Sequence, residues 1–325
     1  MNSRLLLAPL TPLYRLGLVL RERRLASGRE PIRRLRLPVV SIGNLSTGGA
    51  GKTPLAIALA QALAARGIAT DVLSRGYGRR SQASARVDPA GTAQEYGDEP
   101  LLIARTAAVP VYVAPQRYDA GVLAELEKDA QGARVHILDD GFQHRQLHRD
   151  VDILLLSRAD LRDRLLPAGN LREPLHAAER AHVFAIPADD PALESEVRAR
   201  GWKAPVWRIQ RRMEIPPLPG PVQAFCGIAR PAQFFAGLEA AGVTIAARRT
   251  FPDHHRYTQA DLDRLAEQAR AAGATALLTT EKDAVRMEGL RAALPIHTAQ
   301  LHIEIEDGQT ALDWLLARLD SCDRL

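Results

Sequence analysis

Val39-Val-Ser-Ile-Gly-Asn-Leu-Ser-Thr-Gly-Gly-Ala-Gly-Lys-Thr-Pro54 has the order of a phosphate-binding loop: a strand, a glycine-rich turn and a helix. The β-branched run 39–42 predicts a buried strand. An alanine-rich segment with helical spacing follows the turn, so a helix is predicted for residues 55–66, closed by Gly67. The residues predicted to bind the nucleotide are Ser46, Thr47, Gly48, Gly49, Ala50, Gly51, Lys52 and Thr53.

The residue types of this turn have a physical reason. Glycines let backbone N–H groups point at a polyphosphate, and the N-terminus of the following helix adds its dipole. Lys52 is expected to reach the β- and γ-phosphates, and the Thr53 hydroxyl to bind Mg²⁺. The general loop pattern has a glycine where this chain has Ser46, so the alternative is a glycine-rich turn without a ligand.

Lysine is rare in this chain, which makes its position in the loop informative. The sequence has 43 basic residues, and the lysines among them are Lys52, Lys128, Lys203 and Lys282. A lysine where arginine is the usual cation indicates that a compact point charge is needed. Lys282 is of interest for the same reason, although so small a number can also arise by chance.

Length and composition limit the classes of protein to which this chain can belong. A chain of 325 residues with 46% hydrophobic residues predicts two domains, or one large domain with an appendage. Two cysteines, Cys226 and Cys322, do not make a disulfide framework and fit a reducing cytosol, and no Cys/His cluster has zinc-site spacing. The net charge is +5, and residues 1–36 hold nine arginines against two glutamates, which indicates an anionic partner.

The apolar N-terminal run 5–20 is predicted to be an interfacial helix. It is short for a membrane span and is interrupted by prolines and an arginine, and positive charge follows it, unlike a signal peptide. The apolar residues expected in the lipid headgroup boundary are Leu13, Tyr14, Leu16 and Leu20, and the basic ones expected to meet anionic lipid are Arg15, Arg21, Arg23 and Arg24. The alternative is a helix packed on the core with a solvated basic end.

Strand and helix patterns alternate along the rest of the chain. Strands are predicted at 39–42, 70–74, 109–113, 135–138, 151–156 and 182–186, with helices at 55–66, 98–107 and 119–130 and a loop at 81–97. Beyond a proline-rich stretch at 210–221, strands are predicted at 222–225, 244–247, 276–279 and 301–305, with helices at 231–241, 259–272 and 310–319.

This alternation predicts an α/β fold, a P-loop NTPase-like parallel sheet with helices on both faces, plus a smaller C-terminal α/β unit and an N-terminal amphipathic helix. The predicted domains are 1–36, the helix and basic segment; 37–215, the P-loop domain; and 222–325, the C-terminal unit. Ligands of such sheets bind at the carboxyl ends of the strands.

Polar motifs stand at several of these strand ends. Asp139 and Asp140 end an apolar strand, as a Walker-B element that holds Mg²⁺ or its waters would, although Asp-Asp-Gly is also ordinary turn chemistry. Asp98 begins a predicted helix, and the local pattern favours an N-cap over a base or metal ligand. The loop Phe251-Pro-Asp-His-His-Arg-Tyr257 suits acid–base work, phosphate contact or a surface turn.

A further motif is Asn170-Leu-Arg-Glu-Pro174, in which Glu173 could reach a metal and Arg172 a phosphate, or both could cap the next helix.

Together these motifs resemble the tetraacyldisaccharide 4′-kinase family, the lipid A 4′-kinases of Gram-negative bacteria. The matching pieces, in family order, are Gly43-Asn-Leu-Ser-Thr-Gly-Gly-Ala-Gly-Lys-Thr-Pro54, Ser74-Arg-Gly-Tyr-Gly78, Gly97-Asp-Glu-Pro100, Leu138-Asp-Asp-Gly-Phe-Gln-His144, Gly169-Asn-Leu-Arg-Glu-Pro174, Phe251-Pro-Asp-His254 and Thr279-Thr-Glu-Lys-Asp283. Serine at position 46 looks usual for this family.

The resemblance implies phosphorylation by ATP, with Mg²⁺, of the 4′-hydroxyl of a tetraacylated glucosamine disaccharide 1-phosphate. It implies a peripheral enzyme at the cytoplasmic face of the inner membrane. It also implies a catalytic dyad of Asp98 and His254, which replaces the cap interpretation of Asp98, and metal or phosphate roles for Asp139, Asp140 and Glu173. Substrate or phosphate contacts are expected from Asn44, Arg75, Tyr77, Gln143, His144 and Arg172.

Other classes fit less well. A regulatory GTPase needs a base-reading Asn/Thr-Lys-x-Asp motif, and in Thr280-Glu-Lys-Asp283 the lysine directly precedes the aspartate. A partition-type ATPase needs a second lysine where Ser46 and Thr47 stand. A nucleic-acid-binding module could use the basic N-terminus, but leucines interleave with the arginines and no recognition motif occurs, so no nucleic acid is predicted as partner. No sequence feature indicates an obligate protein partner.

Overall fold

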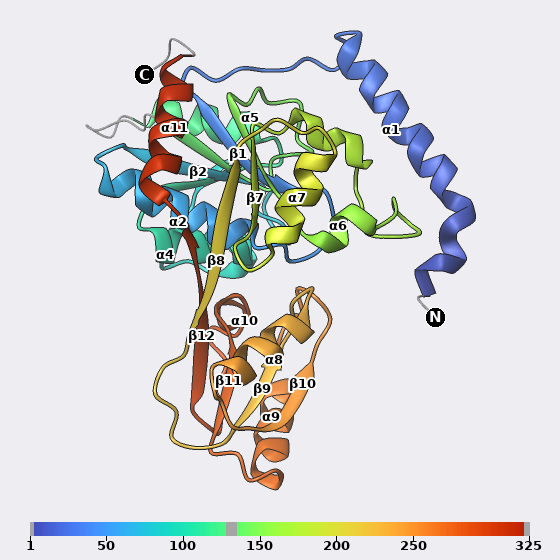
Figure 1. The fold of residues 1–325 in the computed structure, drawn as a ribbon. Helices are drawn as coiled ribbons and strands as arrows, with labels where there is room; N and C mark the ends of the chain where they lie inside the picture. The colour runs from blue at the N-terminus through green and yellow to red at the C-terminus, as the bar shows by residue number, and fades with distance from the viewer. Residues whose placement is uncertain (1–2, 128–134, 322–325) are drawn as a thin grey trace.

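The structure, a computed structural model, describes residues 3–127 and 135–321. Its strands form one sheet in the order β10-β9-β11-β12-β8-β7-β6-β1-β5-β2-β4-β3. Helices lie on both faces of the part that contains β1, and the predicted α/β, P-loop NTPase-like fold is confirmed (Figure 1).

The centre of the sheet is parallel and nearly fully buried. Its strands are β1 (Val39–Asn44), β2 (Thr70–Ser74), β4 (Val111–Val113), β5 (Val135–Asp139), β6 (Val151–Leu155) and β7 (Val183–Pro187). β1 pairs with β5 on one side, Ile42 opposite Asp139, and with β6 on the other. All six residues of β1 are buried, as expected for a strand covered on both faces.

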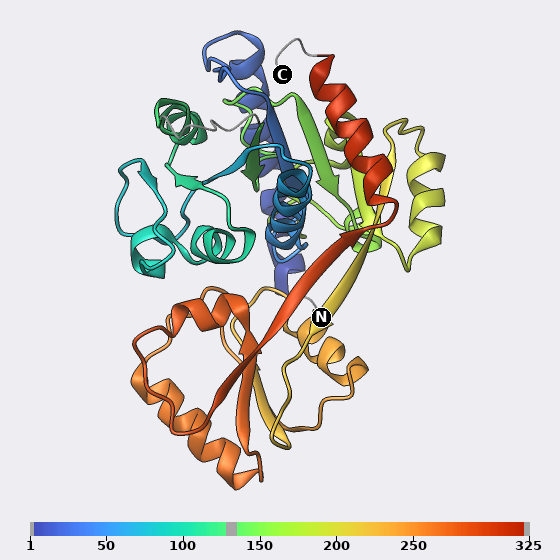
Figure 2. The same ribbon diagram turned by 90° about the vertical axis from the view of Figure 1, so that its left-hand side faces the viewer.

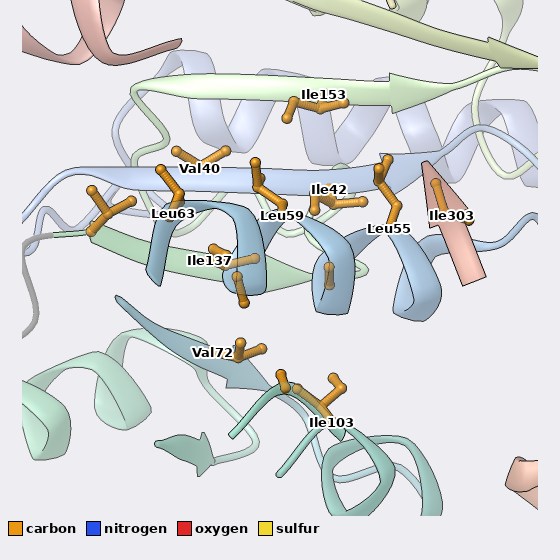
Figure 3. Packing of buried hydrophobic residues seen from close by; sticks show 14 of the residues in the cluster. Val40, Ile42, Leu55, Leu59, Leu63, Val72, Ile103, Ile137, Ile153 and Ile303 are labelled. Carbon is orange, nitrogen blue, oxygen red and sulfur yellow. The ribbon is translucent and has the colours of Figure 1, made fainter. Parts of the chain in front are cut away.

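Helix α2 (Lys52–Ala65) covers this centre. Its buried leucines, Leu55, Leu59 and Leu63, recur at intervals of four and pack against Val40 and Ile42 of β1 (Figure 3). Fully burying three leucine side chains contributes about 5–9 kcal/mol relative to exposed ones. This packing fixes the direction of α2, and therefore where its N-terminus points.

The remaining elements of this part are shorter. They are β3 (Ala85–Arg86), α3 (Ala93–Tyr96), α4 (Asp98–Ala107), α5 (Arg117–Leu126), α6 (Arg158–Arg162), the 3-10 helix η2 (Leu175–Arg180) and α7 (Pro191–Ala199). The prediction of a plain loop at 81–97 was wrong, because β3 pairs with β4 and a capping box starts α3. The last three residues of the helix predicted at 119–130 lie outside the described residues.

The smaller unit contains β9 (Val222–Cys226), β10 (Ile245–Thr250) and β11 (Ala276–Thr280), with helices α8 (Pro231–Ala240), α9 (Gln259–Ala271) and α10 (Glu281–Arg286). Two long strands, β8 (Val206–Glu214) and β12 (Ile296–Ile305), pair antiparallel and run between the two parts (Figure 2).

The C-terminal helix α11 (Gly308–Asp320) departs from the arrangement expected for 222–325. Leu312, Leu315 and Leu319 of α11 belong to the hydrophobic core that contains β1 and α2, because β12 carries the chain back to the larger part (Figure 1). In the proline-rich stretch, β8 continues to Glu214, so regular structure extends into the predicted linker.

The N-terminal segment is helical, with a 3-10 helix η1 (Ser3–Leu10) followed by α1 (Thr11–Ala26). The side chains of Leu13, Leu16 and Leu20 are exposed, as predicted. Tyr14 differs, because its hydroxyl donates to the Arg172 carbonyl oxygen at 2.8 Å and its ring is half-buried against the protein. Among the described residues, no helix combines the length and the apolar character needed to cross a bilayer.

Candidate active site

The phosphate-binding loop connects β1 to α2 in the predicted order. Gly48 has a φ of 96° and Gly51 a φ of 95°, values in the left-handed region that glycine adopts without strain. Gly51 is the N-cap of α2, and no side chain of residues 3–127 and 135–321 caps this helix end. The free N–H groups of the first turn therefore point toward the loop, where an anion is favoured.

Lys52 and Arg172 share one carboxylate beside this loop. Lys52 Nζ lies 3.0 Å from Asn44 Oδ1 and 3.5 Å from Asp140 Oδ1, and Arg172 donates to both oxygens of Asp140 at 3.0 and 3.1 Å. Burial favours the neutral form of Asp140, but the charges of Lys52 and Arg172 outweigh it and hold the pKa of Asp140 below its usual range. Two cations facing one anion leave the net positive charge that phosphates require.

Asp139 is placed differently from Asp140, although the two are neighbours in sequence. Its Oδ2 lies 3.5 Å from Thr53 Oγ1, and its Oδ1 is buried without a hydrogen-bond partner among the described residues. Burial, followed by the nearby carboxylates of Glu99 and Asp140, raises the pKa of Asp139 well above its usual range. A cation placed here would relieve this cost.

These observations fit a Mg²⁺ ion held by Thr53 and Asp139. A hydroxyl and a carboxylate are oxygen ligands of the kind Mg²⁺ takes, and the orphan Oδ1 of Asp139 is an available donor. The described residues contain no group of three or more His, Cys, Asp or Glu side chains that could hold a metal. In nucleotide enzymes, Mg²⁺ is typically bound by one or two protein groups together with phosphates and water.

Glu173, the third predicted metal residue, has another partner. Its carboxylate accepts a hydrogen bond from Arg180 at 2.5 Å, and the Arg180 guanidinium lies over the Phe142 ring. Its neighbour Arg172 does lie in the phosphate site. The structure thus places Asp139 beside Thr53 and Asp140 beside Lys52 and Arg172, whereas Glu173 pairs with Arg180.

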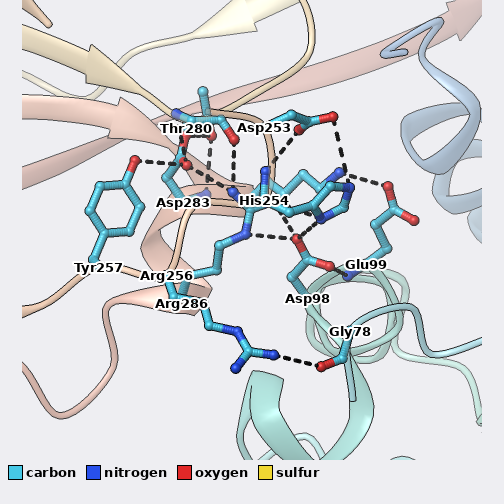
Figure 4. Close-up of polar contacts among 12 residues, drawn as sticks. Gly78, Asp98, Glu99, Asp253, His254, Arg256, Tyr257, Thr280, Asp283 and Arg286 are labelled. Atoms are coloured by element: carbon cyan, nitrogen blue, oxygen red, sulfur yellow. Dashed lines mark hydrogen bonds and ion pairs between the residues drawn. The ribbon is translucent and has the colours of Figure 1, made fainter. Parts of the chain in front are cut away.

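Asp98 and His254 meet across the boundary between the two parts. Asp98 begins α4, and His254, with a φ of 58°, lies in the loop after β10. His254 Nδ1 is 3.0 Å from Asp98 Oδ2, although the residues are 156 positions apart (Figure 4). The cap interpretation from the local pattern was wrong, because the N-cap of α4 is Gly97 and no side chain caps it.

Cations surround this dyad. Burial disfavours the charged form of Asp98, but the hydrogen bond from His254 and the charges of Lys282 and Arg286 outweigh it and hold the pKa of Asp98 well below its usual range. Lys282 Nζ also donates to Glu99 Oε1 at 2.7 Å. Lys282 lowers the pKa of both Asp98 and Asp139, so it links the dyad electrostatically to the phosphate site.

The other predicted contact residues lie around these two centres. Gln143 Nε2 donates to the Asn44 carbonyl oxygen at 2.9 Å, next to Lys52. The Tyr77 ring lies 5.1 Å from the His254 ring and is exposed, as is Arg75. Burial and then the charge of Arg117 lower the pKa of His144 to about 3, so His144 is neutral near pH 7.

Sequence reasoning missed two arginines of this site. Arg286, on α10, contacts Asp98, and Arg211, on β8, donates to the Ala50 carbonyl oxygen in the phosphate-binding loop. Both lie far in sequence from the loop and belong to no recognised motif. The only available signal for Arg286 was its place three residues after Asp283, on the same helix face.

A phosphate-binding loop between a central parallel strand and a helix, with a buried aspartate beside the loop threonine and an Asp–His pair nearby, is typical of P-loop phosphotransferases. The model of the tetraacyldisaccharide-1-P 4′-kinase family matches residues 3–320. A tetraacyldisaccharide 4′-kinase of Koribacter versatilis is 41% identical over 320 residues, which cover 95% of this chain and 97% of that protein. One of Methylobacterium nodulans is 44% identical over 331 residues, which cover 97% and 90%.

Solved structures agree with the sequence comparisons. The crystal structure of an "apo" form of LpxK from Aquifex aeolicus in complex with ATP matches with a TM-score of 0.74 and 32% identity, over 97% of this chain and 99% of that one. The chain belongs to the tetraacyldisaccharide 4′-kinase family. The family resemblance inferred from the motifs is confirmed, and the protein is an ATP-binding kinase of lipid A biosynthesis.

Proposed function

We propose that this kinase transfers the γ-phosphoryl group of ATP to the 4′-hydroxyl of a tetraacylated glucosamine disaccharide 1-phosphate, using the residues described above. The observation that carries this assignment of roles is the contact between Asp98 and His254, 3.0 Å apart and electrostatically linked through Lys282 to the phosphate site. The family name identifies the reaction, and the geometry supports which residues perform it.

The phosphate-binding loop positions the donor. The loop N–H groups and Lys52 would hold the β- and γ-phosphates, with Arg172 as a second cation on the same side. Mg²⁺, when bound by Thr53 and Asp139, neutralises phosphate charge. Phosphoryl transfer depends mainly on positioning and charge, so these cations contribute most of the catalysis.

The dyad would receive the proton of the attacking hydroxyl. Asp98 Oδ2 is engaged by His254 and Arg286, whereas Oδ1 accepts only the Glu99 amide, at 3.0 Å, among the contacts of the described residues. Oδ1 therefore has a lone pair for the substrate hydroxyl. His254 orients the carboxylate, the role that a third group has in other active sites.

The N-terminal helix is proposed to dock the enzyme peripherally on the cytoplasmic face of the inner membrane. Leu13 is 66% exposed and Leu16 54% exposed, and arginines on the same helix are exposed beside them. Tyr14 donates to the Arg172 carbonyl and Arg21 to the Gln143 carbonyl, so α1 lies against residues of the phosphate site. A bilayer-bound α1 would present a lipid substrate near the site that phosphorylates it.

The direct test is incubation of the purified protein with γ-labelled ATP, Mg²⁺ and the acylated disaccharide 1-phosphate in detergent. We expect labelled bisphosphorylated lipid, which a substrate lacking the 4′-hydroxyl would not give. Lys52→Ala, prepared in parallel, reveals label transferred by a contaminating kinase. Chelation of Mg²⁺ should stop transfer, and undiminished transfer in EDTA would reject the metal assignment.

A further inference from the structure

Arg286, on α10, contacts residues on both sides of the boundary between the two parts of the molecule. Its Nε donates to Asp98 Oδ2 at 2.7 Å, and its Nη2 contacts the same oxygen. Its Nη1 donates to the Gly227 carbonyl oxygen at 2.9 Å and to Asp283 Oδ1 at 3.1 Å. Only 6% of its side chain is exposed, so these contacts replace water around the guanidinium.

Contacts within the smaller unit fix the orientation of the Arg286 side chain, in addition to its contact with Asp98. Asp283 is fully buried, and it accepts hydrogen bonds from the Gly227 amide at 3.0 Å and the Tyr257 hydroxyl at 2.9 Å. The Thr280 hydroxyl lies 2.6 Å from its other oxygen. With Asp283 held by these three groups, the Arg286 guanidinium that it binds points at α4 as a preorganised fork.

Arg286 and His254 therefore contact the same oxygen of Asp98 from the same side of the boundary. Arg286 Nη2 lies 3.4 Å from His254 Nδ1, so the two groups are neighbours on Asp98 Oδ2. This arrangement leaves Oδ1, which accepts the Glu99 amide, as the Asp98 oxygen with a lone pair available to a substrate. A general base must be held within a fraction of an ångström to act in a transition state.

We propose that Arg286 is a positioning residue of the kinase, which clamps Asp98 Oδ2 across the boundary so that Oδ1 faces the substrate hydroxyl. This inference rests on the proposed function, because it assigns Asp98 the role of base. This positioning role differs from merely holding the two parts of the molecule together, which other contacts also do. Arg105 of α4 pairs with Glu288 at 3.1 Å, beyond α10, and does not touch Asp98.

The test compares three variants: Arg286→Met, Arg286→Lys and the matched control Arg105→Met, which removes an ion pair across the same boundary. We expect Arg286→Met to lower kcat about 10²-fold, the loss typical of a misplaced catalytic group, with KM for ATP within about 3-fold of wild type. Arg286→Lys should recover only part of this loss, because it keeps the charge at Asp98 but not the fork that also binds Asp283 and Gly227. Arg105→Met should remain near wild type.

A second arm repeats Arg286→Met in an Asp98→Asn background. If Arg286 acts through the Asp98 carboxylate, its removal should cost less than about 3-fold there, because groups that act as a unit are non-additive. Equal losses in both backgrounds would overturn the proposal, as would equal losses in Arg286→Met and Arg105→Met. Thermal unfolding of each variant identifies misfolding. If Arg286→Met does not fold, Arg286→Lys and Arg286→Gln are compared instead. An Arg286→Gln variant as active as Arg286→Lys would then contradict the proposal. A wild type that phosphorylates no lipid would instead reject the proposed function.

Discussion

A buried histidine in the larger part should make the stability of this protein depend on alkaline pH. His136, on β5, is fully buried, with its Nδ1 2.7 Å from Asp71 on β2 and its Nε2 3.6 Å from Glu125 on α5. Burial alone would lower the pKa of His136, but the two carboxylates outweigh it and raise the pKa to about 9. The imidazolium therefore ties β2 and α5 to the strand that ends in Asp139.

The direction and size of this pH dependence follow from the linkage between proton binding and folding. The folded protein binds this proton more tightly than the unfolded chain, whose histidine has a pKa of 6.5. The stabilisation is complete below about pH 6.5 and is lost as pH rises through about 9. The difference between 6.5 and about 9 corresponds to roughly 3 kcal/mol of unfolding free energy, at about 1.4 kcal/mol for each factor of ten.

The assay is urea unfolding of the wild type and of His136→Gln between pH 6 and 9.5. We expect the variant to be less stable by roughly 3 kcal/mol at pH 6, since it leaves two buried carboxylates without their cation, and the gap should narrow steadily toward pH 9.5. His302→Gln, at a 43% exposed histidine beside Glu214, controls for general effects of losing a histidine. A gap that stays constant across this range would show that His136 is not charged in the folded protein and would refute the reasoning.

Three further outcomes are expected. Lys52→Ala should abolish turnover without changing the melting temperature, and Lys52→Arg should also fail because a planar fork does not replace a point charge; normal turnover in either would contradict the loop assignment. Asp98→Ala and His254→Ala should each lower kcat about 10²–10⁴-fold, with ATP affinity little changed. The double variant should be scarcely less active than the poorer single variant, and multiplied losses in kcat would mean that the two residues act independently. Deleting residues 1–24 should shift the protein from vesicles with anionic lipid to the soluble fraction in flotation, and unchanged flotation would place the docking surface elsewhere.

Local pattern was sufficient for the elements that carry the site. The predicted bounds of β2 and α4 agree with the structure residue for residue, and the strand–loop–helix unit around Lys52 has its predicted order. These elements are specified by the periodicity of apolar residues and by the positions of glycines, and both signals act within a few residues. The motif order also paired His254, far along the chain, with Asp98, and the structure brings these two side chains into contact.

Contacts between distant segments could not be read from the sequence. The pairing of Glu173 with Arg180 and the hydrogen bond from Tyr14 to the Arg172 carbonyl depend on how separate segments pack. The packing of α11 against the larger core had no local signal either. The spacing of its apolar residues predicts that one face is buried, but not which part of the protein covers that face.

The strands between the two parts also touch the phosphate-binding loop, which relates the two centres of the site. Arg211 of β8 donates to the Ala50 carbonyl oxygen, and a Cβ on Gly51 would lie 3.1 Å from the Arg211 guanidinium and 3.5 Å from Ile303 of β12. The same two strands connect to the unit that supplies His254 and Arg286. A shift of β8 and β12 relative to the larger sheet would therefore disturb the loop and the Asp98–His254 pair together, so these two strands couple the geometry of both centres.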